Sequence, residues 1–251
     1  MAEPLLSVQR ISKRFGGLLA VDAASLTVTS GSITALIGPN GAGKTTLFSI
    51  ITGFLTPSDG NVRYDGVDIT GEPPHKLARL GITRTFQIVQ PFAGLSVLEN
   101  IAVGAHLRQA GRHAALTAAE AIAHEVGLDD ALVRPASDLT VAGRKRLELA
   151  RALATAPKLL LLDEVLAGLN PSEIRDIVPV IRGIRDRGVT ILMVEHVMQA
   201  VMSLAEHVYV LAEGRIIASG PPAAIVSDPK VIEAYLGHGA AQRLAGGVHA
   251  G

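Results

Sequence analysis

A glycine-rich stretch, GPNGAGKTT at residues 38–46, constrains this chain more than any other feature. It satisfies the spacing G-x-x-x-x-G-K-[ST] and follows an apolar run at residues 32–37 that is typical of a buried strand. Glycine permits the positive φ values that let a backbone curl with its N–H groups pointing inward. The pattern therefore predicts a loop that cradles phosphate groups. The expected phosphate-binding residues are Gly38, Pro39, Asn40, Gly41, Ala42, Gly43, Lys44, Thr45 and Thr46.

Lys44 and Thr45 add two chemical functions to this loop. We expect Lys44 to reach the β- and γ-phosphates of ATP and the Thr45 hydroxyl to ligate Mg2+. A helix beginning near Lys44 adds its positive N-terminal end. A negative charge there gains only about 0.3–1 kcal/mol, whereas micromolar affinity for ATP needs roughly 8 kcal/mol of binding free energy. All of these parts are therefore needed. The alternative is a glycine-rich turn that contains a lysine by chance, which the flanking strand and helix disfavour.

Composition narrows the possible classes of protein. The 251 residues suffice for one large α/β domain or two small ones, and 23 basic residues balance 23 acidic ones. No net field favours nucleic acid or an anionic membrane surface, so we expect no nucleic-acid partner. The absence of cysteine excludes disulfides and thiolate metal sites. We also expect no signal peptide and, without a run of 18 apolar residues, no membrane-spanning helix.

Three predicted strands end in polar groups. Residues 158–162, KLLLL, form an apolar run typical of a strand buried on both faces of a parallel sheet, and residues 189–194 form another strand. The endings are the phosphate loop, Asp163 with Glu164, and Glu195 with His196. In open parallel sheets, ligands bind beyond the carboxyl ends of the strands. These endings are therefore expected to meet around one nucleotide.

Each polar ending suits one part of phosphoryl chemistry. Asp163 is expected to hold Mg2+ directly or through water, and Glu164 to orient or deprotonate the attacking water. His196 is placed to contact the γ-phosphate. A lone histidine after a strand is more often structural, but the position opposite the other strand ends favours the functional interpretation.

The remaining elements predict a composite architecture. Short strands at residues 5–10, 24–29 and 61–64 indicate a small antiparallel sheet, and residues 82–87 a further strand. Ser96 with Glu99, and Asn170 with Glu173, form capping-box pairs at the start of two helices. Pro179 is expected to kink or divide the second of these helices.

The order of these motifs resembles that of the ATP-binding subunits of ABC transporters, over nearly the whole chain. The motifs are the phosphate loop, TRTFQ, a motif before ELARAL, LLLLDE, a capped helix and a histidine after a strand. The resemblance implies an α/β P-loop NTPase fold with a RecA-like parallel sheet core, an antiparallel β subdomain and an α-helical insert. It implies one domain over residues 1–237, with a core of about 1–87 and 156–220, a helical subdomain of about 88–155 and a frayed tail at 238–251.

The resemblance also implies roles for single residues. Phe15 would stack on adenine, Gln87 would link Mg2+ to the transmembrane partner, Glu164 would be the catalytic base and His196 the switch histidine. Taken alone, Phe15 is as well explained as a core aromatic, and Gln87 as a surface residue. Two such subunits would sandwich two ATP molecules, each site completed by the partner's signature motif.

Within that family, several stretches resemble the branched-chain amino-acid transporter group. They are RTFQIVQPFAGLSVLENIAVGAH, DEVLAGLNPSE, VEHVMQAVM and DPKVIEAYLG. The resemblance implies a second ATPase, two transmembrane permeases and, indirectly, a periplasmic solute-binding protein as partners. It places the chain peripherally at the cytoplasmic face of the inner membrane. Urea, other amides or other amino acids remain alternative solutes.

The chain departs from the family at the signature motif, which usually reads LSGGQ. Here residues 139–143 read LTVAG, so Thr140 keeps a hydroxyl for the γ-phosphate, whereas Ala142 and Gly143 replace glycine and glutamine. The cap on the opposite ATP is then expected to be looser. Asn170 also stands where aspartate is usual and Val165 where proline is usual. One sequence does not decide whether these changes slow hydrolysis or are tolerated.

Two other functions stay open. One is a soluble ABC ATPase acting on ribosomes or DNA repair complexes, although such proteins usually carry a second cassette or long inserts. The other is a binding module that closes on ATP but hydrolyses it poorly. The basic triplet at residues 144–146 is interpreted as a solvated or interface face of a helix.

Overall fold

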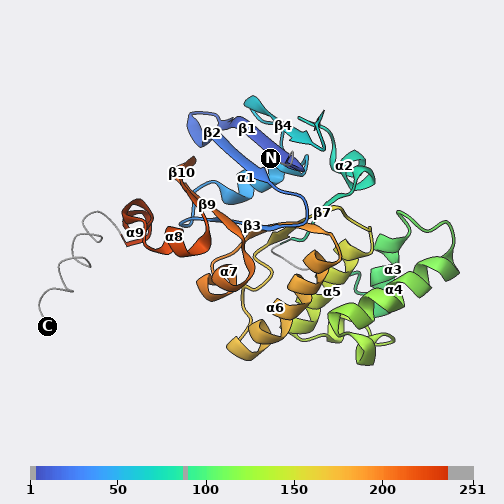
Figure 1. Ribbon diagram of the computed structural model, residues 1–251. Coiled ribbons are helices and arrows are strands. Elements are labelled where there is room, and N and C mark those ends of the chain that lie inside the picture. Colours follow the sequence, from blue (N-terminus) through green and yellow to red (C-terminus); the bar gives the residue numbers. More distant parts are fainter. Residues whose placement is uncertain (1–3, 87–89, 237–251) are drawn as a thin grey trace, which may run out of the picture.

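Two β-sheets and a layer of helices make up the computed structural model, which describes residues 4–86 and 90–236 (Figure 1). The larger sheet has the strand order β10-β9-β3-β8-β7-β6. Its strands are β3 (Ile33–Ile37), β6 (Ile82–Arg84), β7 (Leu159–Asp163), β8 (Thr190–Val194), β9 (His207–Ala212) and β10 (Arg215–Gly220). Neighbours are parallel except β9 and β10, which form an antiparallel hairpin. The parallel core is therefore as expected from the sequence.

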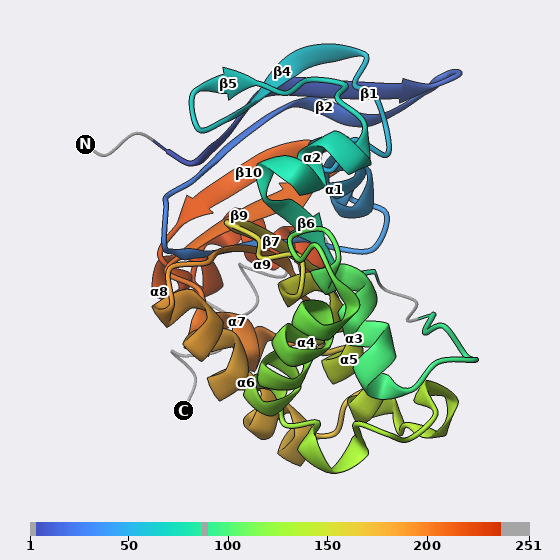
Figure 2. The same cartoon turned by 90° about the vertical axis from the view of Figure 1, so that its right-hand side faces the viewer.

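The smaller sheet is antiparallel and lies above the larger one in Figures 1 and 2. It has the order β2-β1-β4-β5, with β1 (Leu6–Phe15), β2 (Leu18–Val28), β4 (Asp59–Tyr64) and β5 (Val67–Asp68). Strands β1 and β2 are longer than predicted. Register shifts interrupt their pairing near Arg10 and Ala23, both at positive φ, and such bulges break the alternation by which strands are recognised.

The central strands are buried on both faces, which explains their continuous apolar sequence. Alternate residues such as Leu36, Leu161 and Leu192 pack with α1 (Lys44–Ile51) and the small sheet. The intervening residues, such as Ala35 and Leu160, pack against the helices on the other face. Helix α1, with the phosphate loop before it, is thereby held between the two sheets.

The other helices form a layer below the large sheet or cover its edges (Figure 2). They are α2 (Pro74–Leu80), α3 (Val97–Ala105), α4 (Arg112–Val126), α5 (Val141–Leu153), α6 (Pro171–Asp186), α7 (Met198–Leu204), α8 (Pro222–Val226) and α9 (Pro229–Leu236), with 3-10 turns at Asp129–Ala131 and Ala136–Asp138. Helices α3 and α5 approach closely at Gly104, where a Cβ atom would lie 2.4 Å from the Arg151 carbonyl oxygen. None of the helices in the described ranges is long and apolar enough to cross a bilayer.

Both predicted capping boxes form. Ser96 Oγ accepts from the Glu99 N–H at 3.2 Å, and Asn170 Oδ1 accepts from the Glu173 N–H at 3.1 Å, with the glutamates bonding back in each case. Of the two expectations for Pro179, a kink or a division of the helix, division does not occur, because α6 runs unbroken past it. Buried isoleucines of α6 pack into the core on both sides of the proline and hold the helix in place.

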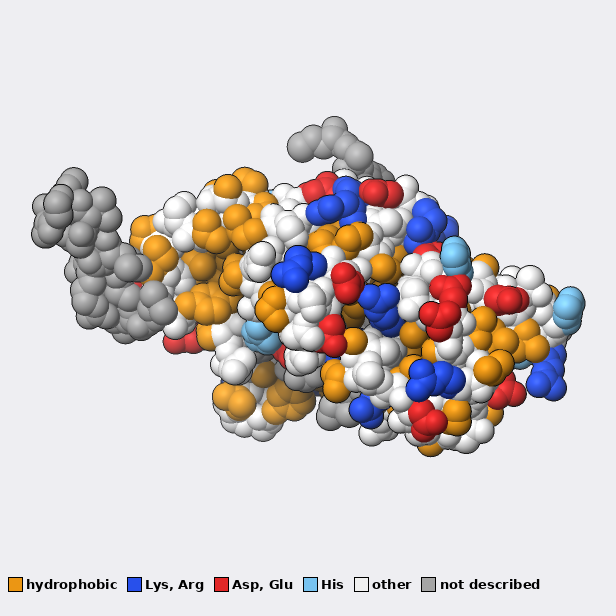
Figure 3. Space-filling view, turned by 90° about the horizontal axis from the view of Figure 1, so that it is seen from below, with side chains coloured by type: hydrophobic (Ala, Val, Ile, Leu, Met, Phe, Trp, Pro, Cys, Tyr) orange, Lys and Arg blue, Asp and Glu red, His pale blue; other side chains and the backbone are white. Residues whose placement is uncertain are grey.

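The face formed by the helical layer carries mixed charges. Seen from below, lysines and arginines alternate with acidic side chains among apolar ones, and no patch of a single sign stands out (Figure 3).

Candidate nucleotide site

The phosphate loop joins β3 to α1 and requires glycine at two close approaches. A Cβ atom on Gly38, at φ 152°, would lie 1.9 Å from the Leu211 carbonyl oxygen, and one on Gly43, at φ 104°, would lie 2.4 Å from the Ala20 carbonyl oxygen. Gly43 is also the N-cap of α1, and no side chain caps that helix. No side chain of the cap therefore competes for the first N–H groups of α1, which suits an anion site.

Lys44 lies back across this loop. Its Nζ donates to the carbonyl oxygens of Gly38 at 2.8 Å and Pro39 at 2.9 Å, and the side chain is buried. Burial lowers the pKa of Lys44, while the charges of Glu164 and Asp163 oppose that shift. The ammonium group is thus held inside the loop, within reach of anions that replace the two carbonyl oxygens.

The three predicted strand ends are adjacent in the sheet. Val194 of β8 pairs with Leu36 of β3 on one side and with Asp163 of β7 on the other. The Glu164 N–H donates to the Val194 carbonyl oxygen at 2.9 Å. The phosphate loop, Asp163-Glu164 and Glu195-His196 therefore start from the same edge of the sheet, as the sequence predicted.

Glu164 and His196 are in direct contact. Glu164 Oε1 lies 2.6 Å from His196 Nε2. Glu164 adopts φ 50°, a left-handed conformation that costs a residue with a side chain about 1–2 kcal/mol. Lys145 Nζ donates to the Glu164 carbonyl oxygen at 3.1 Å. This contact supports the unusual backbone of Glu164.

The contact also corrects one prediction. We interpreted the triplet 144–146 as a solvated or interface face, but Lys145 is buried. Lys145 comes four residues before Leu149, which is also buried, so the two lie on the same face of α5. The surface interpretation is therefore wrong for Lys145.

Asp163 and Thr45 line one cavity of about 530 Å³, whose wall also contains Arg84 and Glu148. Burial raises the pKa of Asp163, and the Arg84 guanidinium opposes this shift. Among the described residues no group of three or more His, Asp or Glu side chains could hold a metal ion by itself. One carboxylate and one hydroxyl fit Mg2+ well, because this ion keeps several waters and takes phosphate oxygens as further ligands.

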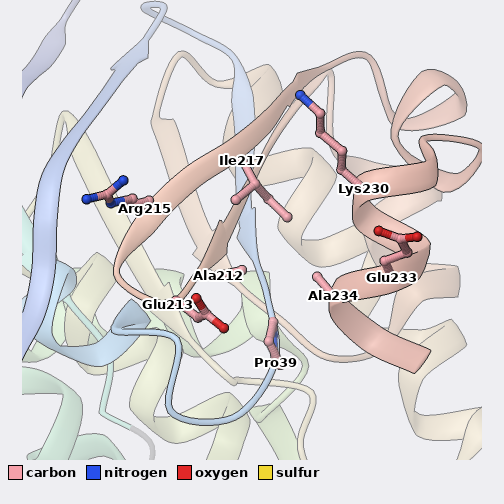
Figure 4. A pocket seen from close by; sticks show the side chains of 8 residues that line it. All are labelled: Pro39, Ala212, Glu213, Arg215, Ile217, Lys230, Glu233 and Ala234. Atoms are coloured by element: carbon pink, nitrogen blue, oxygen red, sulfur yellow. The ribbon is translucent and has the colours of Figure 1, made fainter. Parts of the chain in front are cut away.

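A separate cavity of about 480 Å³ lies between the β9–β10 turn and α9, with Pro39 in its wall (Figure 4). Its lining carries two acids, Glu213 and Glu233, and two bases, Arg215 and Lys230. Of the phosphate loop only Pro39 lines this cavity, and neither Thr45 nor Asp163 does. The cavity with Thr45 and Asp163 is the better candidate.

The residues predicted to contact adenine and the partner's ATP lie on other elements than the phosphate loop. Phe15 is half exposed at the tip of the β1–β2 hairpin, and that hairpin touches the loop where Ala20 approaches Gly43. Thr140 caps α5 by accepting from the Gly143 N–H at 3.1 Å, with Ala142 in the same first turn. Gln87 lies outside the described residues.

Sequence reasoning missed Arg84 and gave Glu195 no role of its own, although both side chains are buried at the site. Arg84 pairs with Asp163, and Glu195 Oε1 accepts from the Leu166 N–H at 3.0 Å. Burial raises the pKa of Glu195 to about 7. A signal existed for Glu195, which directly follows an apolar strand. Arg84 gave none, because its partner depends on which strands are neighbours.

The sequence profile of the ABC transporter family matches residues 21–167. This chain belongs to the ABC transporter ATP-binding family. As such it is an ABC-type ATPase with an α/β nucleotide-binding fold. A second profile, described as a branched-chain amino acid ATP-binding cassette transporter, matches residues 215–241.

Relatives and solved structures agree with this assignment. The chain is 42% identical over 253 residues to the high-affinity branched-chain amino acid transport ATP-binding protein BraF of Pseudomonas aeruginosa, covering 94% of this chain and 99% of that protein. It is 39% identical to LivG of Escherichia coli, a protein of the same description, with the same coverage. A nucleotide-free ATP-binding cassette from an ABC transporter superposes with a TM-score of 0.85 at 34% identity, covering 93% of this chain and 99% of that one. A cassette in its ADP conformation gives 0.85 at 35% identity, covering 94% and 100%.

Proposed function

We propose that this chain is the ATP-hydrolysing subunit of an importer for branched-chain amino acids. The observation that carries the proposal is the meeting of three strand ends, which brings the phosphate loop, Asp163 and the Glu164–His196 pair to one edge of the sheet. The substrate class is supported by the printed descriptions of BraF and LivG and by the profile matched at residues 215–241.

Binding begins at the phosphate loop. Lys44 exchanges the carbonyl oxygens of Gly38 and Pro39 for β- and γ-phosphate oxygens, and the N-terminus of α1 donates N–H groups. Thr45 and Asp163 would hold Mg2+, which when bound neutralises charge on the transferring phosphoryl group. Phe15 would stack on the adenine ring.

Hydrolysis is assigned to Glu164. Its carboxylate takes a proton from water as the water oxygen bonds to the γ-phosphorus, and the bond to the bridging oxygen of ADP breaks. His196, 2.6 Å away, fixes the carboxylate and is placed to contact the γ-phosphate. The contact of Lys145 with the Glu164 carbonyl oxygen keeps that backbone in its left-handed conformation.

The assembly we propose contains a second ATP-binding subunit, identical or different, and two transmembrane permeases. Thr140, Ala142 and Gly143 would face the ATP of the partner subunit, and residues 88–155 would act as a helical subdomain. Gln87 would link Mg2+ to the permeases, and a periplasmic solute-binding protein would act through them. The subunit would then lie peripherally at the cytoplasmic face of the inner membrane.

ATP hydrolysis with purified partners tests this proposal. The chain is assayed alone and then in lipid with candidate permease subunits from the same organism, with and without a binding protein loaded with leucine. Stimulation by the permeases and the loaded protein supports the motor and its substrate class. Hydrolysis that ignores these partners favours a soluble ABC ATPase, and stimulation by urea or amides instead of leucine replaces the solute. ATP binding without turnover in either setting favours the binding module.

A further inference from the structure

Arg84 forms a buried ion pair with the carboxylate assigned to Mg2+. Its Nη2 donates to Asp163 Oδ2 at 2.6 Å, and the two side chains are only 8% and 2% exposed. The pair forms because β6, which ends at Arg84, lies directly beside β7, which ends at Asp163. Both residues line the cavity that contains Thr45. A positive group of the chain itself therefore occupies one oxygen of this carboxylate.

The same guanidinium also contacts two aromatic rings. Its central carbon lies 5.7 Å from the ring centroid of Phe54 and 5.0 Å from that of Phe86, and the two rings meet edge to face at 5.6 Å. These rings are 50% and 46% exposed. Arg84 thus connects an exposed aromatic pair to the interior of the candidate nucleotide site.

Other acceptors lie within reach of the guanidinium. Its Nη1 is 3.3 Å from Ser49 Oγ of α1 and 3.4 Å from Oγ1 of Thr52, the C-cap of that helix. These distances are long for good hydrogen bonds, so the contacts can shorten if the side chain turns towards α1. The hydroxyl groups of Ser49 and Thr52 thus offer Arg84 acceptors other than Asp163.

We propose that Arg84 is a positioning residue that competes with Mg2+ for Asp163 and moves towards α1 when the metal binds. The inference deepens the proposed function and rests on it. The guanidinium takes up acceptor sites of Asp163 Oδ2, and its positive charge repels a metal ion that binds the same carboxylate. Movement of Arg84 then alters its contact with Phe54 and Phe86. Binding of Mg2+ inside the site thereby changes the surroundings of these two exposed aromatic rings.

Magnesium-dependent ATP binding tests the competition directly. Arg84→Gln and Arg84→Lys are prepared in a Glu164→Gln background, so that no ATP is consumed, and a fluorescent ATP analogue reports binding as Mg2+ is titrated. Arg84→Gln should lower the Mg2+ concentration that gives half-maximal ATP binding roughly tenfold. A neighbouring arginine changes the pKa of an aspartate by about 1–3 units, and tenfold corresponds to the low end of that range. Arg84→Lys keeps the charge and should stay close to the parent. An unchanged or higher Mg2+ requirement for Arg84→Gln overturns the proposal.

A tryptophan reporter tests the movement with Arg84 intact. The chain contains no tryptophan, so Phe86→Trp introduces a single emitter against the guanidinium. Phe92→Trp is the matched control, because Phe92 is also 46% exposed and lies 4.7 Å from another guanidinium, that of Arg151. Adding Mg2+ to the ATP-loaded protein should change the emission at position 86 and leave position 92 unchanged. No change at 86, or equal changes at both, contradicts the movement, and this experiment decides if Arg84→Gln does not fold.

The two proposals fail in different ways. ATP binding by the parent is first measured at saturating Mg2+. Absence of ATP binding there would contradict the nucleotide site itself. Normal binding there, with a half-effect Mg2+ concentration that does not change in Arg84→Gln, would contradict only the role of Arg84.

Discussion

The phosphate loop can be tested with two substitutions that add the same methyl group. Gly38→Ala places a Cβ atom 1.9 Å from the Leu211 carbonyl oxygen, which belongs to a buried central strand. The two atoms must separate by more than about 1 Å to reach ordinary contact, so the loop must move. Gly41→Ala, at φ 80°, meets no atom within 4 Å and carries only the cost of a left-handed backbone.

The expected effects differ in size and in kind. The displaced loop should lose about two hydrogen bonds to phosphate, each worth about 1.5–3 kcal/mol, so Gly38→Ala should weaken ATP binding at least roughly a hundredfold. Gly41→Ala should lose about 1–2 kcal/mol of folding stability but bind ATP within about tenfold of the parent, because its loop keeps its shape. Titration calorimetry gives the affinities and urea unfolding the stabilities. If Gly38→Ala binds ATP as tightly as Gly41→Ala, the assignment of this loop as the phosphate cradle is refuted.

Three further substitutions test the other groups of the site. Lys44→Ala should remove tight ATP binding in calorimetry, because it deletes a charged donor worth about 1.5–3 kcal/mol per bond; unchanged affinity would contradict the role of Lys44. Glu164→Gln should retain ATP and elute as an ATP-dependent dimer in size-exclusion chromatography, whereas a monomer with normal turnover would reject the catalytic role. Burial raises the pKa of Glu195 from 4.5 to about 7, so in that window the folded state binds more protons than the unfolded state, and stability falls as pH rises. In urea unfolding, the free energy of unfolding of Glu195→Gln should fall less between pH 5 and pH 7.5 than that of the parent, by up to about 3 kcal/mol. An equal fall in both proteins would contradict this prediction.

Local patterns sufficed to predict much of the site. The phosphate loop is a contiguous motif whose flanking strand and helix are visible in the sequence, and it forms as predicted between β3 and α1. Asp163, Glu164 and His196 were proposed because polar residues directly follow buried strands, and parallel strands bring such residues to one edge. The contact between Glu164 and His196 is the structural result of that rule.

Contacts between residues far apart in the sequence could not be predicted from local patterns. Arg84 and Asp163 are 79 residues apart, and their ion pair exists because β6 and β7 are neighbours, which no local pattern indicates. The expected strand over residues 82–87 was also too long, since β6 ends at Arg84. The prediction for Lys145 failed for a different reason. Its helical spacing from Leu149 was visible in the sequence, but the basic triplet was nevertheless interpreted as a surface.

Phosphate release from Mg-ATP by the purified chain tests the central claim most directly, with Glu164→Gln measured beside it as the matched background. The account predicts steady release by the wild-type chain, rising when its permeases are added, and loss of that release in Glu164→Gln although ATP still binds. Equal release by the two proteins, or none by a wild-type chain that binds ATP in the presence of its permeases, would contradict the account.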